Sequence, residues 1–177
     1  MADRQSIQAD DAEAMRIERA LDVAEGPDER ARAYLSLGLL GEKREDWNAA
    51  IGSYAKALAA GSLRADFNYF GNNNLGFALI QLGRFDEAED YCVAAMRIDP
   101  SRHNAHKNLG LVRQAQGRWP DAAHCFVEAH RLCPIDPRAW HLLSALLHRH
   151  PALLAQSAEL RSRVAAIATN DGTATSN

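Results

Sequence analysis

Histidine and cysteine are the side chains in this sequence whose chemistry and spacing could support metal binding. Seven histidines are present, and three pairs have helical spacing: His103 with His106, His141 with His148, and His130 with Cys133. A structural or catalytic zinc site needs three or four protein ligands at defined spacings. No third and fourth ligand with recognisable spacing accompanies any pair, so we expect no metal site.

Signatures of catalysis are also missing from the sequence. It contains no G-x-S-x-G nucleophile elbow, no P-loop and no H-E-x-x-H motif, each of which places reactive groups at a fixed spacing. The segment His148-Arg149-His150-Pro151 fits the end of a helix, where cationic side chains suit the negative end of the dipole. We therefore expect no catalytic residues, no cofactor and no enzymatic activity.

A leucine followed by a small residue recurs along the chain, as Leu37-Gly38, Leu75-Gly76, Leu109-Gly110 and Leu143-Ser144. The last three leucines are 34 residues apart. A fixed period of this size indicates stacked helix-turn-helix units, each of which buries its apolar face against its neighbours. The elements that would position any functional side chain are therefore pairs of helices.

Other positions repeat with the leucines. A glycine follows eight residues after the leucine at Gly83 and Gly117, where positive φ would end the first helix of a pair. The second helix carries two alanines seven residues apart with a larger residue between them, which is Tyr54, Cys92 or Phe126. The small residue after leucine should let the two helices of a pair approach closely.

This set of residues resembles the tetratricopeptide repeat family. Asn74-Leu75-Gly76 to Asp99-Pro100 and Asn108-Leu109-Gly110 to Pro134 match the repeat closely, whereas the earlier unit has Glu45 in place of the usual glycine and lacks the final proline. The resemblance covers roughly residues 31–150. It implies an all-α fold: a right-handed superhelical solenoid of helix-turn-helix repeats with capping helices at both ends.

The expected organisation follows from these matches. It comprises a disordered N-terminus (1–9), a capping helix (10–27), three repeats (28–64, 69–102 and 103–136), a degenerate fourth repeat with a capping helix (137–169), and a disordered tail (170–177). The first join is four residues longer than the period, within 60–68, and an extended loop there would either shift the superhelix or reach over the groove.

In the family, the first helix of each pair lines a concave groove, and the resemblance assigns these positions to it: Leu39, Lys43, Phe70, Asn73, Asn74, Phe77, Asn104, Lys107, Asn108, Leu111, Arg138 and His141. Apolar residues would form its floor and cationic residues its rim, which suits a peptide with apolar anchors and acidic residues. Asn74 and Asn108 look like the asparagine ladder by which some members hold a peptide backbone.

Composition limits the other classes of partner. The net charge of −3 argues against a general nucleic-acid-binding protein, and no apolar run is long enough to cross a membrane. Three cysteines without a CxxC motif fit buried, reduced thiols, and together with the polar N-terminus they indicate a cytoplasmic protein.

Three functions remain open from the sequence. The first is an adaptor or scaffold that binds a peptide segment of a partner protein. The second is a dedicated chaperone similar to the three-repeat chaperones of type III secretion systems. The third is a scaffold that self-assembles through the ends of its stack, for which the acidic N-terminal and basic C-terminal regions are suited.

Overall fold

The computed structural model describes the backbone of residues 4–174 and the side chains of residues 8–167. Within those residues the chain is made of α-helices joined by short turns, which confirms the all-α repeat fold. It divides into two compact units, residues 1–99 and residues 100–177, and each is described here by itself.

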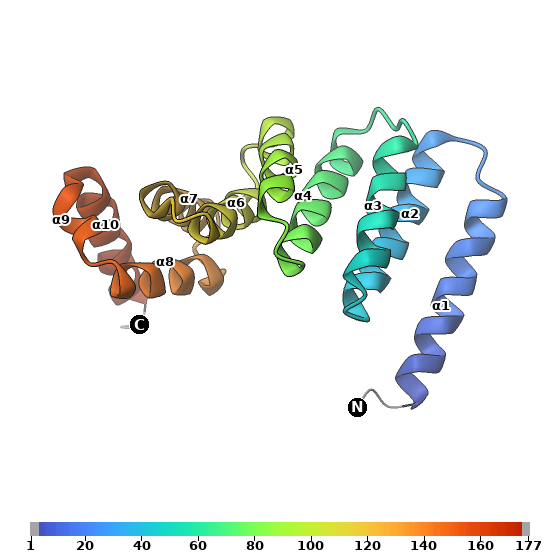
Figure 1. The fold of residues 1–177 in the computed structure, drawn as a ribbon, viewed down its shortest axis with the longest axis horizontal. Helices are drawn as coiled ribbons and strands as arrows, with labels where there is room; N and C mark the ends of the chain where they lie inside the picture. Colours follow the sequence, from blue (N-terminus) through green and yellow to red (C-terminus); the bar gives the residue numbers. More distant parts are fainter. Residues whose placement is uncertain (1–3, 175–177) are drawn as a thin grey trace. The chain divides into compact units, whose positions relative to one another are not determined.

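The first unit contains five helices, which Figure 1 shows as a terminal helix followed by antiparallel pairs: α1 (Arg4–Asp22), α2 (Pro27–Lys43), α3 (Trp47–Ala59), α4 (Ala65–Gln81) and α5 (Phe85–Ile98). Helices α2 and α3 form one pair, and α4 and α5 form the next, with α4 also packed against α3 and α2. Helix α1 packs on α2. The core of this unit is built around buried Tyr54, Tyr69, Leu75 and Leu79.

The second unit also contains five helices: α6 (His103–Ala115), α7 (Trp119–Leu132), α8 (Pro137–Arg149), α9 (Ala152–Gln156) and α10 (Ala158–Ala174). Helix α6 pairs with α7, and α8 packs on α7. A core cluster centred on Phe126, Leu143, Leu146 and Leu160 joins α7, α8 and α10. The short α9 therefore brings α10 back onto the same apolar core.

Some boundaries differ from the sequence expectation. Residues 4–9, expected to be disordered, form the start of α1, and α10 continues through residues 170–174 of the expected tail. Residues 1–3 and 175–177 lie outside the described part of the chain. Residues 65–68, expected within a long loop, form the first turn of α4. Helix α4 is therefore as long as α2, and each has 17 residues.

The remaining loop stays beside α2. The Ser62 hydroxyl donates to the Asp28 carboxylate at 2.6 Å, and the Asn68 amide donates to the Ser62 carbonyl at 3.0 Å. These bonds tie the loop to the first turn of α2 and the first turn of α4. Leu63 points away from both and is almost fully exposed.

Each of the three glycines that follow a leucine of the repeat provides space for a particular side chain of the second helix. A Cβ atom at Gly38 would collide with the Tyr54 ring, and one at Gly110 would lie 2.5 Å from the Phe126 ring. At Gly76, a Cβ atom would lie 2.8 Å from Cys92 Sγ. The recurring glycine and the larger residue between the alanines are therefore partners in one contact, repeated in each pair.

The first helix of each pair ends in the same way. Gly83 and Gly117 have φ of 72° and 75°, and the next residue in each case donates its N–H to the carbonyl five residues earlier. This is the Schellman arrangement, in which a left-handed residue lets the last carbonyls find donors. Glu45 occupies the equivalent place after α2 with φ of 56°.

Glu45 is therefore held in a conformation that disfavours a side chain, and we expect Glu45→Gly to stabilise the protein. The left-handed region costs a residue with a Cβ atom roughly 1 kcal/mol relative to glycine. Denaturant unfolding should show an increase of that order in the free energy of unfolding. The reverse change at the matched position, Gly117→Glu, should lower it by a similar amount; equal stability of Gly117→Glu and wild type would contradict this account.

Candidate functional site

Lys43 and Leu39 lie beside the N-terminal helix of the first unit. Lys43 Nζ donates to Asp10 Oδ1 at 2.5 Å, and this contact raises the pKa of the Lys43 ammonium. Leu39, 53% exposed, shares with Lys43 a small pocket of about 180 Å³ that Glu13 of α1 also lines. The acidic group expected from a partner at Lys43 is therefore supplied by the chain itself.

Asn73 and Asn74 belong to a polar network in the interior of the first unit. Asn73, which is buried, donates to the Asn74 side chain at 2.9 Å, and the Asn74 amide reaches the Tyr54 hydroxyl at 3.5 Å. The Tyr54 hydroxyl in turn donates to Glu42 Oε1 at 2.6 Å. Asn74 thus remains half-buried within a network that joins α2, α3 and α4, rather than standing alone as a rung.

The two aromatic candidates of α4 have different surroundings. Phe70 is 40% exposed and packs edge-on against the Tyr69 ring at a centroid distance of 5.6 Å. Phe77 is half-buried and packs edge-on against Trp47 at the start of α3, with centroids 5.9 Å apart. Both rings keep part of their surface open to solvent, as an apolar contact site for a partner requires.

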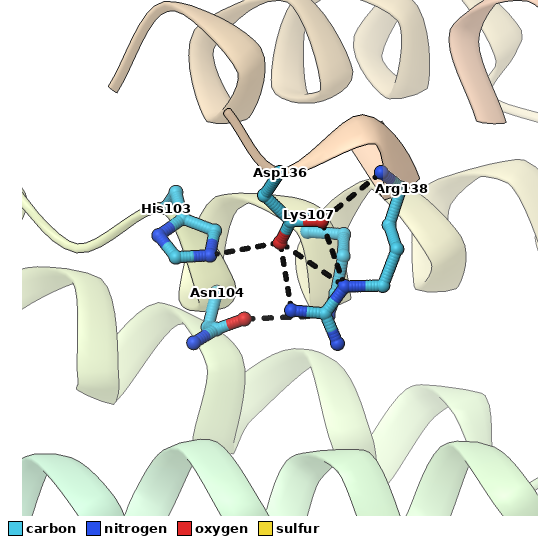
Figure 2. A network of polar contacts seen from close by, with 5 residues as sticks. All are labelled: His103, Asn104, Lys107, Asp136 and Arg138. Carbon is cyan, nitrogen blue, oxygen red and sulfur yellow. Dashed lines mark hydrogen bonds and ion pairs between the residues drawn. The ribbon is translucent and has the colours of Figure 1, made fainter. Parts of the chain in front are cut away.

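In the second unit, a carboxylate that the sequence analysis did not select organises the candidates. Asp136 precedes α8 and accepts from the backbone N–H of Arg138 at 3.0 Å, so it caps the helix. Its carboxylate also binds the Arg138 guanidinium through two bonds, at 2.9 and 2.7 Å, and the His103 ring of α6 at 3.1 Å. Figure 2 shows the Asp136 carboxylate between these two side chains.

Lys107 and Asn104 of α6 complete this group, which we call the Asp136 cluster: His103, Asn104, Lys107, Asp136 and Arg138 (Figure 2). Lys107 is buried, and its ammonium donates to Asn104 Oδ1 at 3.3 Å. Burial lowers the pKa of the Lys107 ammonium, the nearby Arg138 lowers it further, and Asp136 partly opposes them. The hydrogen bonds from Arg138 hold the pKa of Asp136 well below its usual range.

The other candidates of the second unit are distributed around α6 and α8. Asn108 is 2% exposed, so it is not presented at the surface as a ladder requires. Leu111 is half-buried and packs against the apolar core, and His141 is exposed on α8. Asn74, the other residue of the expected ladder, is half-buried, so the two asparagines differ in how far a peptide could reach them.

The sequence pattern does not identify Asp136 and Asp10, the two carboxylates that contact the candidate site residues. Asp136 lies in a turn. One side-chain partner, Arg138, is two residues away in α8, and the other, His103, is 33 residues away in α6. The Asp-Pro pair that opens α8 is a helix-start signal that could have identified it. Nothing in the sequence indicates that Asp10 reaches Lys43, because that pair depends on how α1 packs.

The chemistry available to these groups is recognition by charge and hydrogen bonding. Among the described residues, no three histidine, cysteine, aspartate or glutamate side chains gather where they could hold a metal ion. Every helix in the described part of the chain is too short or too polar to span a bilayer. The Asp136 cluster contains the cationic side chains of Lys107 and Arg138 and one carboxylate, which leaves an excess of positive charge within the cluster.

Comparison with known proteins places these features in context. A family model described as "Tetratricopeptide repeat" matches residues 71–134, from α4 to the end of α7. No curated protein sequence matches the chain.

Solved structures resemble a larger part of the chain. The TPR domain of Arabidopsis OM64 is 27% identical with a TM-score of 0.64, and the match covers 70% of this chain and 99% of that one. The second TPR domain of human RPAP3, determined with the HSP70 peptide SGPTIEEVD, is 26% identical with a TM-score of 0.61, over 68% of this chain and 98% of that one. MamA of Desulfovibrio magneticus RS-1 is similar in fold alone: it is 13% identical with a TM-score of 0.72, over 94% of this chain and 88% of that one.

Proposed function

We propose that the chain is a tetratricopeptide-repeat interaction module that binds a peptide segment of a partner protein; the repeat model matches residues 71–134. The contacts would come from the first helix of each pair, through half-exposed apolar residues such as Phe70 and Phe77 and through the Asp136 cluster. The similar RPAP3 domain was determined with a peptide that contains both acidic and apolar residues.

The proposal rests on one observation: Lys107 is buried without a carboxylate partner among the described residues. Its ammonium donates to no carboxylate within hydrogen-bond distance in the part of the chain that the structure describes; its one hydrogen-bond partner there is the neutral amide of Asn104. A buried charge is costly unless it is paired, and the lowered pKa of Lys107 reflects that cost. Asp136 is already engaged by Arg138 and His103. A carboxylate from a partner would supply the missing charge.

We expect Lys107→Met to weaken binding of the partner while leaving the fold intact. Methionine keeps the apolar stem of the lysine and removes only the ammonium, so packing is preserved. Loss of one member of a close charge pair usually weakens binding at least about tenfold. The measurement is affinity capture from the source organism, followed by titration of the captured partner against both proteins.

Two controls make this test specific. Lys56→Met makes the same change at an exposed lysine of α3, outside the Asp136 cluster, and should bind as wild type does. Thermal melting should give Lys107→Met a stability equal to or above that of wild type, because a desolvated charge has been removed. If Lys107→Met and Lys56→Met retain the same partner with the same affinity, Lys107 does not contribute to the binding site.

A further inference from the structure

The first unit contains a partly buried carboxylate, Glu42, that lacks an ion-pair partner among the described residues, as the Lys107 ammonium does in the second unit. Glu42, near the end of α2, is half-buried, and the Tyr54 hydroxyl is its hydrogen-bond donor at 2.6 Å. Among the described residues Glu42 forms no ion pair. Burial raises the pKa of the Glu42 carboxyl, which the hydrogen bond from Tyr54 only partly opposes. A carboxylate in this condition is stabilised by a cation brought to it.

The cations next to Glu42 in the sequence are directed elsewhere. Lys43 Nζ contacts Asp10, and Arg44 contacts Asp11 at 2.8 Å, both on α1. Helix α1 therefore engages both of these cations. Among the described residues, no cationic side chain pairs with the Glu42 carboxylate.

The surroundings of Glu42 fit a basic side chain. Asn74 contacts Tyr54 from α4, and Phe77 lies one helical turn after Asn74 on the same face. The Glu42 carboxylate can accept a charge-assisted hydrogen bond from an ammonium or a guanidinium, and the nearby amide of Asn74 adds a polar group of the kind that such a cation contacts.

We propose that Glu42, held by Tyr54, which Asn74 contacts in turn, binds a lysine or arginine side chain of the partner segment. This inference rests on the proposed peptide-binding function and extends it. A segment that binds the first unit at Glu42 then carries a basic residue, and a segment that binds the Asp136 cluster of the second unit carries an acidic one. The first unit thus selects for a basic residue, whereas the sequence analysis expected acidic residues in the partner.

The experiment is a selection from a phage-displayed library of random peptides against three proteins: wild type, Glu42→Gln and Lys107→Met. Glutamine keeps an acceptor for the Tyr54 hydroxyl and removes only the charge, so a structural role of Glu42 is preserved. Peptides selected by wild type should be enriched in basic and in acidic residues. Those selected by Glu42→Gln should lose the basic enrichment and keep the acidic one, which also shows that the variant is folded. Glu18→Gln, an exposed control on α1, should select as wild type does.

A binding cycle then tests the contact directly. A synthetic peptide from the wild-type selection is compared with a copy in which glutamine replaces its basic residue. The original peptide should bind Glu42→Gln about tenfold more weakly than wild type, as for a charge-assisted hydrogen bond, and the substituted peptide should bind both proteins equally. Losses that simply add would overturn the assignment of the basic residue to Glu42.

The remaining outcomes separate this inference from the proposed function. One outcome is that the wild-type protein selects peptides that are enriched in acidic residues alone, and that Lys107→Met loses that enrichment. This result would overturn the Glu42 site and leave the proposed function standing. If the peptides selected by Glu42→Gln are still enriched in basic residues, the Glu42 site is overturned and the proposed function again stands. Failure of wild type to select any peptide would remove both. A Glu42-dependent cycle with no effect of Lys107→Met would support the site on the first unit and overturn the Asp136 cluster as the acidic one.

Discussion

Gly110→Leu is expected to lower the free energy of unfolding by about 1–3 kcal/mol, the usual cost of overpacking a well-packed interior. A Cβ atom at this position already lies 2.5 Å from the Phe126 ring, and Phe126 has no exposed surface into which it could move. The added side chain must therefore separate α6 from α7 or displace the ring. Denaturant unfolding followed by circular dichroism measures the change.

Matched glycine substitutions isolate the steric part of this effect. Gly52 lies within α3 with no atom near the position of its Cβ, so Gly52→Ala should stabilise the protein by roughly 0.5–1 kcal/mol through helix propensity alone. Gly110→Ala has the same propensity gain and the clash in addition, so it should be the less stable of the two. Equal stability of these two variants would mean that α6 and α7 are not packed in this register.

A double substitution tests whether Phe126 is the side chain responsible. Phe126→Ala leaves a cavity and should cost about 3–5 kcal/mol by itself. Combined with Gly110→Leu, the total loss should be smaller than the sum, because the leucine enters the space that the ring has left. Additive losses would assign the clash at Gly110 to another neighbour.

The repeat made this contact predictable in outline. A fixed period sets which faces of the two helices meet, so Gly110 was expected at a close approach between helices. The structure adds that the close approach is to the ring of Phe126, the larger residue between the alanines, rather than to backbone alone. The same spacing at Gly38 and Tyr54 gives the same contact in the first unit.

The candidate site was less predictable, for a physical reason. The family resemblance names a face of each first helix, but burial depends on what packs over that face. Asn108 lies on the named face and is buried, and Lys43 lies on it and is paired by Asp10 of α1. Neither the packing of α1 nor the position of Asp136 in a turn follows from the repeat period. The repeat period therefore predicts where the helices lie, whereas the ion-pair partner of each charged side chain is seen only in the structure.

Asp136→Ala is expected to lower the free energy of unfolding by about 2 kcal/mol. The change removes the cap of α8, which is worth about 1 kcal/mol, and the contact between α8 and His103 of α6. The ion pair with Arg138 adds less than about 1 kcal/mol, because the Arg138 side chain is 62% exposed. Asp136→Asn keeps an oxygen that can cap the helix, so it should lose only the charge-dependent part.

The charge-dependent part should also vary with pH in a defined direction. The pKa of Asp136 is well below its usual range in the folded protein, so the folded state favours the carboxylate more than the unfolded state does. Its contribution is therefore complete above the pKa of an unfolded aspartate, about 3.9, and is lost as pH falls below that value toward the folded pKa. Below about pH 4 the difference in stability between wild type and Asp136→Asn should therefore shrink. A difference that stays constant from pH 7 to pH 2 would mean that the Asp136 charge does not stabilise the junction of α6 with α8.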